Sequence, residues 1–189
     1  WTGHIEAGTV LNGIVSHADW FVTFLNAAGN PNIAAELRAG TELDGKEYKV
    51  YLDGHDQLDY LTGKADESPR NYFFYMSDDG DLTAMRFDNW KFIFLEQRMR
   101  GTMAIWMEPF VELRMPKLFN LRTDPYERAE ETSNSYFDWI LARAFLFVPA
   151  QSFVAEHLQS LADFPVVQKP AAFNLEKVME KLQAGIISS

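Results

Sequence analysis

Apolar residues near the start of the chain recur with the period of a helix. They lie three or four positions apart, as on one face of an amphipathic helix, at Trp20, Phe21, Phe24, Leu25 and Ala28. The preceding residues fit a capping box, with Ser16 as the N-cap and Asp19 at the third helical position. Gly29 is a helix stop signal. We therefore expect a helix that ends near Ala28, entered by a strand over residues 8–15.

Three shorter elements are expected next. A second helix covers Ile33 to Arg38, because Gly40 ends that pattern. Alternating apolar and polar residues favour a short strand over Tyr48 to Leu52. One or two helical turns are expected over Asp56 to Leu61, before a polar loop.

The middle of the chain has the pattern of a β-meander. Aromatic-rich, alternating segments are separated by the turn sequences Asp78-Asp79-Gly80 and Asp88-Asn89. A fourth strand follows a long irregular stretch. The expected strands cover residues 71–77, 81–87, 90–95 and 117–121. Together they predict a small antiparallel four-stranded sheet.

The helical period returns after Ser135. Tyr136 to Phe147 is apolar almost all round, which predicts a buried helix. Pro149 is expected to kink or break it, and an apolar stripe continues at Val154, Leu158 and Leu161. A last helix is expected from Asn174, with one apolar face formed by Leu175, Val178, Met179 and Leu182. A meander followed by so apolar a helix predicts an α+β fold, with the helix on one face of the sheet.

Composition narrows the classes of partner and of chemistry. The chain has 189 residues, 47% of them apolar, which suits one domain or one domain with an appendage. Its net charge is −10 without a visible Lys/Arg patch, so we expect no nucleic-acid partner. No apolar run approaches the roughly 20 residues of a membrane span. The lack of cysteine excludes disulfides, thiolate metal sites and a cysteine nucleophile in these residues.

Three combinations of residues resemble reactive or metal-binding sites, but each has a simpler structural interpretation. Ser16, His17 and Asp19 are the residue types of a hydrolytic triad, yet one helical turn does not give them triad geometry. The sequence Asp78 to Asp81 is not followed by the glycine and glutamate that an EF-hand loop has at its sixth and twelfth positions. It is typical of a hairpin turn. No metal-ligand spacing relates the four histidines, His4, His17, His55 and His157. We therefore assign no catalytic residue and no metal ligand.

The irregular stretch Glu96 to Pro116 is the best candidate contact site. It carries Trp106, Met107 and Phe110, and aromatic and methionine side chains often line pockets or partner surfaces. Long connections are usually functional or disordered, and the aromatic residues argue against disorder. We predict that these three residues contact a substrate or a partner; the alternative is that the stretch only covers the sheet.

Several motifs, in order along the chain, resemble those of the sulfatase family, specifically the C-terminal portion of bacterial arylsulfatases. The family patterns are W-P-G-x-I-x-x-G, S-H-x-D-x-x-P-T-L, D-G-x-D with L-T-G, L-F-x-L-x-x-D-P-x-E and a tail sequence. The matching segments are Trp1–Gly8, Val15–Leu25, Leu52–Gly63, Leu118–Glu127 and Gln168–Leu175. Thr2 and Val22 replace prolines of these patterns, at positions that shape the backbone.

The resemblance implies which part of a sulfatase this chain represents. The family uses calcium and a formylglycine nucleophile made from the Cys or Ser of C/S-x-P-x-R. Ser68-Pro69-Arg70 lacks the intervening residues of that motif. The resemblance therefore implies a catalytic centre upstream of Trp1. Residues 1–45 would be the last strand and helix of an alkaline-phosphatase-like α/β catalytic domain, and residues 46–189 the C-terminal domain.

By the same resemblance, the partners are the remainder of the catalytic domain and, in the parent enzyme, a small sulfate ester. Family habit suggests a periplasmic or secreted location, and the chain alone is expected to be inactive. Three alternatives stay open. The chain could be a non-catalytic binding or assembly module, the remnant of a truncated sulfatase, or part of a related metal-dependent phosphatase or phosphonate hydrolase.

Overall fold

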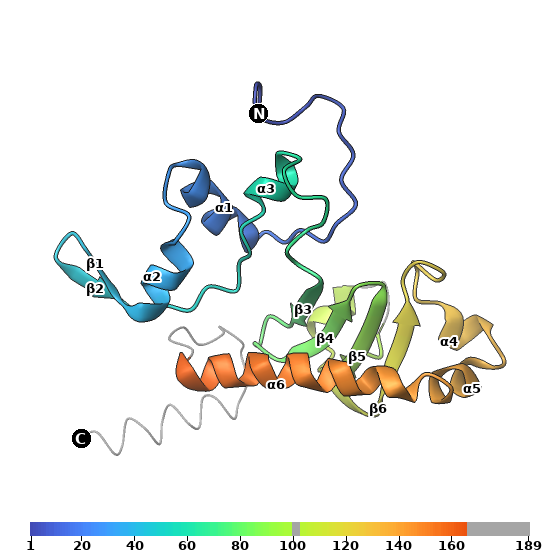
Figure 1. Ribbon diagram of the computed structural model, residues 1–189. Coiled ribbons are helices and arrows are strands. Elements are labelled where there is room, and N and C mark those ends of the chain that lie inside the picture. The colour runs from blue at the N-terminus through green and yellow to red at the C-terminus, as the bar shows by residue number, and fades with distance from the viewer. Residues whose placement is uncertain (100–102, 166–189) are drawn as a thin grey trace, which may run out of the picture.

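The computed structural model describes residues 1–99 and 103–165. This part of the chain is α+β, with a two-stranded hairpin and a four-stranded antiparallel sheet in the order β3-β4-β5-β6 (Figure 1). The strands are β1 Thr41–Leu43, β2 Lys46–Tyr48, β3 Tyr72–Met76, β4 Leu82–Phe87, β5 Trp90–Glu96 and β6 Val111–Asn120. The helices are α1 Asp19–Ala27, α2 Ile33–Ala39, α3 Leu58–Leu61, α4 Ala129–Thr132, α5 Tyr136–Leu141 and α6 Phe147–Asp163, with 3-10 turns η1 Met103–Trp106 and η2 Ala144–Leu146.

The four-stranded sheet confirms the predicted meander. β3, β4, β5 and β6 pair antiparallel in chain order. Gly80 and Asp88 have positive φ angles of 86° and 48° in the turns that join β3 to β4 and β4 to β5. Gly80 takes this conformation without a steric penalty. The turn residues therefore set the sheet order locally, as the sequence pattern predicts.

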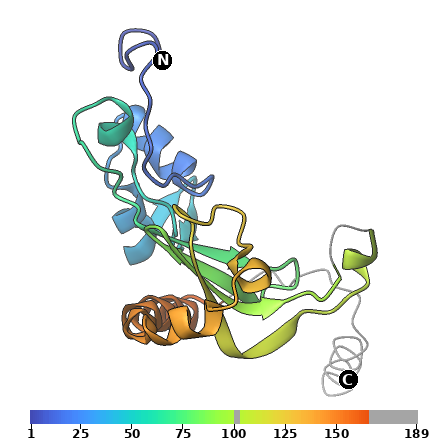
Figure 2. The ribbon, with the colours of Figure 1, turned by 90° about the vertical axis from the view of Figure 1, so that its right-hand side faces the viewer.

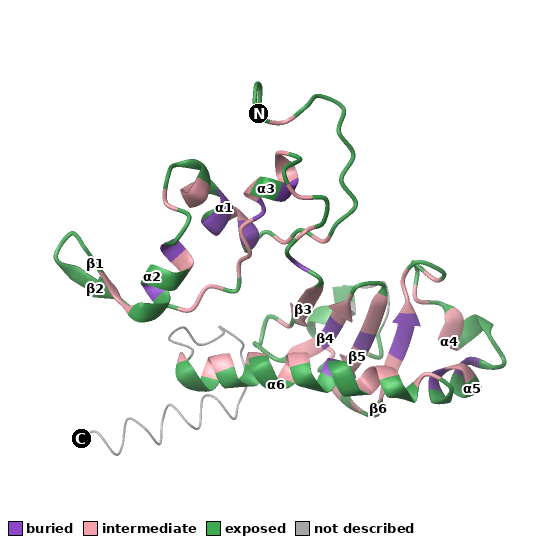
Figure 3. Cartoon of the chain, in the orientation of Figure 1, coloured by how far each residue is buried: buried purple, intermediate pink, exposed green. Residues whose placement is uncertain are grey.

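Helix α6 covers one face of the sheet, as the apolar stripe predicts. The Phe153 ring lies 5.0 Å from that of Tyr72 and 4.9 Å from that of Phe87, and Phe147 lies 5.5 Å from Phe92. The buried residues between the sheet and the helices are Met85, Phe92, Leu118, Phe119, Tyr136, Ile140 and Ala150 (Figure 3). Full burial of one large apolar side chain is worth about 1.5–3 kcal/mol, so this core holds α5 and α6 on the sheet.

The last strand, β6, starts six residues earlier than predicted. Its first part pairs with the end of β5, where Leu95 is opposite Glu112 and Glu96 is opposite Val111. The register between β5 and β6 shifts beside Pro116, which has no N–H to give to a ladder. Because of this proline, the sequence predicts a strand only from residue 117. In the structure, β6 pairs with β5 on both sides of Pro116.

The predicted helix over Tyr136 to Phe147 is wrong in its extent. The chain instead forms α5, the turn η2 and then α6, so the break precedes Pro149. Pro149 is the third residue of α6. The first four N–H groups of a helix have no partner within the helix, so a proline there removes no bond.

The prediction that this segment is buried all round is also wrong. Tyr136 and Ile140 are buried against the sheet. The opposite side is 63–69% exposed, at Phe137, Leu141, Phe145 and Val148. Helical segments that lie on one face of a single sheet bury only the side that meets it.

The N-terminal elements pack around a second, smaller core. Val22 of α1 and Ile33 and Leu37 of α2 are buried there. The predicted first helix is confirmed at its C-terminal end, but it begins at Asp19. The Ser16 hydroxyl accepts the Ala18 N–H, at 3.3 Å, and no N–H of the helix. The predicted strand over residues 8–15 is absent, since this segment has no partner strand within the described chain. The predicted alkaline-phosphatase-like portion is thus not seen.

The other short elements agree in part with the predictions. The helices at 33–39 and 58–61 are confirmed. The strand predicted over Tyr48 to Leu52 is wrong, because pairing ends where Tyr48 meets Thr41 at the base of a hairpin. The domain boundary predicted after residue 45 falls in the turn of this hairpin and remains a prediction. The helix predicted from Asn174 lies outside the described residues.

Candidate functional site

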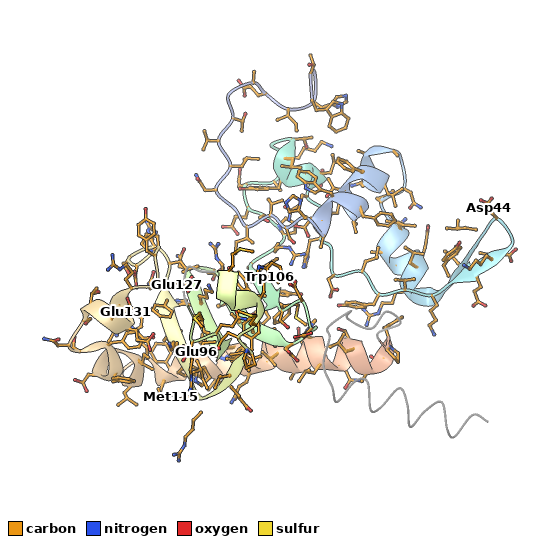
Figure 4. The ribbon with its side chains drawn as sticks, turned by 180° about the vertical axis from the view of Figure 1, so that it is seen from behind. Asp44, Glu96, Trp106, Met115, Glu127 and Glu131 are labelled. Atoms are coloured by element: carbon orange, nitrogen blue, oxygen red, sulfur yellow. The ribbon has the colours of Figure 1, made fainter. Side chains whose placement is uncertain are left out.

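The first candidate site is the connection between β5 and β6, which carries the three predicted contact residues. Trp106 ends the turn η1, and Met107 and Phe110 follow it. Figure 2 shows this connection extending beyond the sheet, away from α1 and α2, and Figure 4 labels Trp106 on it. Trp106 is 72% exposed, Met107 82% and Phe110 37%. The first two side chains therefore do not serve as a cover for the sheet.

A glutamine at the end of β5 ties the two arms of this connection together. The Gln97 side-chain amide donates to the carbonyl of Ile105, at 2.9 Å, and to that of Glu108, at 2.7 Å. Other apolar residues on or beside the connection are also exposed, namely Met99, Met103, Ile105 and Met115. A cluster of exposed apolar side chains on a tethered loop is typical of an interaction surface. The contact role of Trp106, Met107 and Phe110 stays a prediction.

The second candidate site surrounds a buried ion pair between α1 and the segment that enters β3. Asp19 has no exposed surface and Arg70 is 5% exposed. The Arg70 guanidinium donates through Nη2 to Oδ1 of Asp19, at 2.5 Å, and through Nε to both carboxylate oxygens, at 3.0 Å. Nη2 also donates to the carbonyl of Asp53, and Nη1 to that of Tyr72. One arginine thus joins α1, the loop at 53–57 and β3.

The carboxylate of Asp19 is saturated by further donors. It accepts the backbone N–H groups of Ser16 and His55, both at 2.8 Å, and the side-chain amide of Gln57, at 3.0 Å. Gln57 is itself fully buried. Buried charges in proteins need such pairing and hydrogen bonding. The arrangement therefore has the character of a structural connection rather than of a reactive group.

A polar cavity of about 690 Å³ lies beside this ion pair. Two long-range bonds hold its N-terminal wall, from the Gly13 N–H to the Tyr60 hydroxyl and from the Ser68 hydroxyl to the Ile14 carbonyl, both 2.6 Å. Gly13 is required here, because a Cβ would lie 2.7 Å from the Tyr60 oxygen. The charged residues of the lining are Asp66, Glu67, Arg70, Arg86 and Asp88. Since Arg70 is committed to Asp19, this lining does not favour a sulfate ester.

Burial and hydrogen bonding shift two pKa values at the ion pair. Burial by itself raises the pKa of Asp19, but the bonds from Arg70, His55, Ser16 and Gln57 outweigh it, and the pKa is lowered. The pKa of His55 is lowered by burial and by the nearby positive charge of Arg70. The folded protein therefore favours a charged Asp19 and a neutral His55.

These shifts predict that stability falls in acid in two stages. The unfolded His55 takes up a proton below about pH 6.5, while the folded one resists it, so the stability that it contributes is lost as the pH falls below that value. The Asp19 contribution is present above pH 3.8 and is lost as the pH falls through the lowered pKa of the folded state. We expect the urea midpoint to fall between pH 7 and 5, and again below pH 4.

The matched variant for this prediction is His55→Gln, which keeps the backbone donor to Asp19 and removes the imidazole. It should flatten the dependence between pH 7 and 5 and keep the loss below pH 4. A wild-type midpoint that is constant from pH 7 to 5 would contradict the assignment to His55.

The structure shows how the triad-like residues are arranged, and it reveals two further site residues that the sequence did not indicate. Asp19 binds Arg70, so Ser16, His17 and Asp19 form no hydrolytic triad. Arg70 and Gln57 were missed, because their partner Asp19 lies 51 and 38 positions away. The available signal was weak: an arginine directly before an aromatic strand, and a helix start with an acidic residue.

The described residues do not offer a site for the calcium that the sequence resemblance implies. No three His, Asp or Glu residues among them are placed to hold a metal ion. None of the helices in the described residues has the length and apolar character needed to cross a membrane.

Comparison with solved structures shows similarity to a sulfatase. A solved structure, the PsFucS1 sulfatase from Pseudoalteromonas sp., is similar to 89% of this chain, with 27% sequence identity and a TM-score of 0.63. The fold is sulfatase-like. No family model and no curated protein matches the chain.

The sulfatase-like chain covers only 30% of the PsFucS1 chain. It thus has the extent of one region of a larger enzyme. Seventy per cent of that sulfatase has no counterpart in these residues, so the activity of a whole enzyme is not carried over by the similarity.

Proposed function

We propose that this chain is the C-terminal part of an arylsulfatase-like sulfuric ester hydrolase whose catalytic centre precedes Trp1. The similarity to PsFucS1 over 89% of the chain, but only 30% of that sulfatase, carries the proposal. The ordered motifs from Trp1–Gly8 to Leu118–Glu127 support it. The absence of a metal-binding cluster among the described residues is consistent with chemistry performed elsewhere in the protein.

Calcium and a formylglycine nucleophile belong to the upstream part in this proposal. A divalent cation there would polarise the nucleophile and the sulfate oxygens, and the chain described here would supply a surface next to that centre. A periplasmic or secreted location follows from family resemblance alone and remains part of the proposal.

The alternatives make different predictions for the natural full-length protein. A sulfatase should hydrolyse 4-nitrophenyl sulfate faster than the corresponding phosphate or phenylphosphonate ester. The opposite preference would assign the chain to a metal-dependent phosphatase or phosphonate hydrolase. No turnover of any of these esters, with stable binding to another protein, would favour the binding or assembly module.

The β5–β6 connection gives the proposal a site-specific test. In the full-length enzyme, Trp106→Ala should raise KM about tenfold with little change in kcat, because truncation of an exposed aromatic anchor mainly removes binding energy. If Trp106 contacts a partner subunit instead, the variant should change the oligomeric state in sedimentation velocity. Tyr126→Ala is a suitable control, because Tyr126 is even more exposed than Trp106, at 83%, and lies outside the connection. Unchanged KM and assembly would remove Trp106 from the contact surface.

A further inference from the structure

An apolar groove lies between α6 and the strands β5 and β6, and of the candidate-site residues named above it includes Met115. It has a volume of about 550 Å³. Phe94, Met115 and Pro116 line it on the strand side, and Phe147, Val154 and Leu158 on the helix side. Leu158 and Met115 are still 56% and 44% exposed. An open apolar groove of this kind is expected to be covered by a further apolar segment.

The chain itself provides such a segment. Beyond α6, which ends at Asp163, 26 further residues remain. Leu175, Val178, Met179 and Leu182 are spaced three or four positions apart, which is the spacing at which residues share one face of a helix. The charged residues Glu176, Lys177, Glu180 and Lys181 fall between them. This is the pattern of a helix that buries one face in a groove.

Chain length and direction allow the segment to reach the groove. Ten residues, 164–173, join α6 to Asn174, and in extended form they span up to about 33 Å. The groove runs beside η2 and α6 from Ala144 to Leu158, a distance of about 21 Å along a helix. Leu175 to Leu182 would occupy about 10 Å of it. A chain that turns back after Asp163 therefore reaches any part of the groove.

We propose that residues 174–182 dock in the groove between α6 and β5–β6 and cover Leu158 and Met115. The proposal concerns a contact within this chain and does not depend on the sulfatase assignment. A second copy of the chain is the alternative occupant, and the test separates it from residues 174–182.

Thiol reactivity in the 189-residue chain tests the proposal, because these 189 residues contain no cysteine. Two single variants are compared, Leu158→Cys in the groove and Val148→Cys on the exposed side of α6, where Val148 is 66% exposed. The maleimide reaction of Leu158→Cys should be at least about tenfold slower than that of Val148→Cys, as expected for a thiol exposed only by local opening. Adding Val178→Asp should restore the fast rate of Leu158→Cys and leave that of Val148→Cys unchanged.

Lys181→Asp is the matched control, because it adds an acidic residue to the polar side of the same segment. It should leave the slow rate of Leu158→Cys unchanged. Equal rates for Leu158→Cys and Val148→Cys would show an open groove and overturn the proposal. If the slow rate of Leu158→Cys is unchanged by Val178→Asp but rises when the protein is diluted, a second copy occupies the groove. This result also overturns the proposal. Unchanged circular dichroism and an unchanged Val148→Cys rate establish that the Val178→Asp variant is folded.

Discussion

Replacement of Arg70 by methionine is expected to lower the free energy of unfolding by about 3–5 kcal/mol. The change removes one partner of a fully buried ion pair, and the charge that remains on Asp19 is left uncompensated. The carbonyls of Asp53 and Tyr72 also lose the donor that Arg70 provides, and Asp19 keeps only the bonds from Ser16, His55 and Gln57. Urea unfolding followed by circular dichroism measures the effect.

The double variant Asp19→Leu with Arg70→Met distinguishes loss of the ion pair itself from the cost of leaving one buried charge without a partner. Removal of both charges leaves no unpaired buried ion, so the loss should be clearly smaller than the sum of the two single losses. Lys64→Met is the surface control, because Lys64 and Asp59 form a largely exposed pair. It should change stability by less than about 1 kcal/mol. An Arg70→Met variant as stable as this control would show that the buried pair does not connect α1 to the sheet.

The chain on its own is expected to have no sulfatase activity. Hydrolysis needs an activated nucleophile and, in the sulfatase family, a metal pocket. The chain lacks cysteine and the C/S-x-P-x-R motif, and its described residues contain no metal-binding cluster. Such enzymes accelerate hydrolysis by many orders of magnitude, so the expected difference between the chain and a complete enzyme is nearly all-or-none.

The measurement is release of 4-nitrophenol from 4-nitrophenyl sulfate by the purified chain. It should not exceed the buffer rate, and 5 mM calcium should not change it (about the saturating range for weak sites). A complete sulfatase assayed in parallel is the positive control. Turnover that follows the chain through purification would contradict the assignment of the catalytic centre to upstream residues.

Local signals in the sequence predicted most of the sheet. The turns at Gly80 and Asp88 are formed by neighbouring residues, and the alternation in β3 to β5 shows which positions are buried. The predicted extent of β6 was too short. Its first part pairs with Leu95 and Glu96 and is interrupted at Pro116, and a local pattern does not reveal such pairing. Pairing between strands is not a local property, so a proline inside a strand misleads a local pattern.

The helices and the N-terminal segment show where burial cannot be deduced from apolar content. Phe137, Leu141 and Phe145 are as apolar as Ile140, but only Ile140 meets the sheet. The extended residues 8–15 have a strand-like composition but no partner in the described chain. Whether such residues are buried depends on what else packs against them.

The candidate sites were predictable to different degrees. The β5–β6 connection could be selected from Trp106, Met107 and Phe110, because a long aromatic connection is unusual in itself. The ion pair could not, since Asp19 and Arg70 lie 51 positions apart and each has a plausible local role. Asp19 does bind the Ser16 N–H as a capping residue would, but its buried arginine partner is the larger part of its environment.

Peptide sequencing of the natural protein by mass spectrometry decides whether a sulfatase centre precedes Trp1. We expect a chain that continues upstream of Trp1 and contains C/S-x-P-x-R there, with the Cys or Ser converted to formylglycine. A natural protein without that motif upstream of Trp1 would contradict the proposed sulfatase.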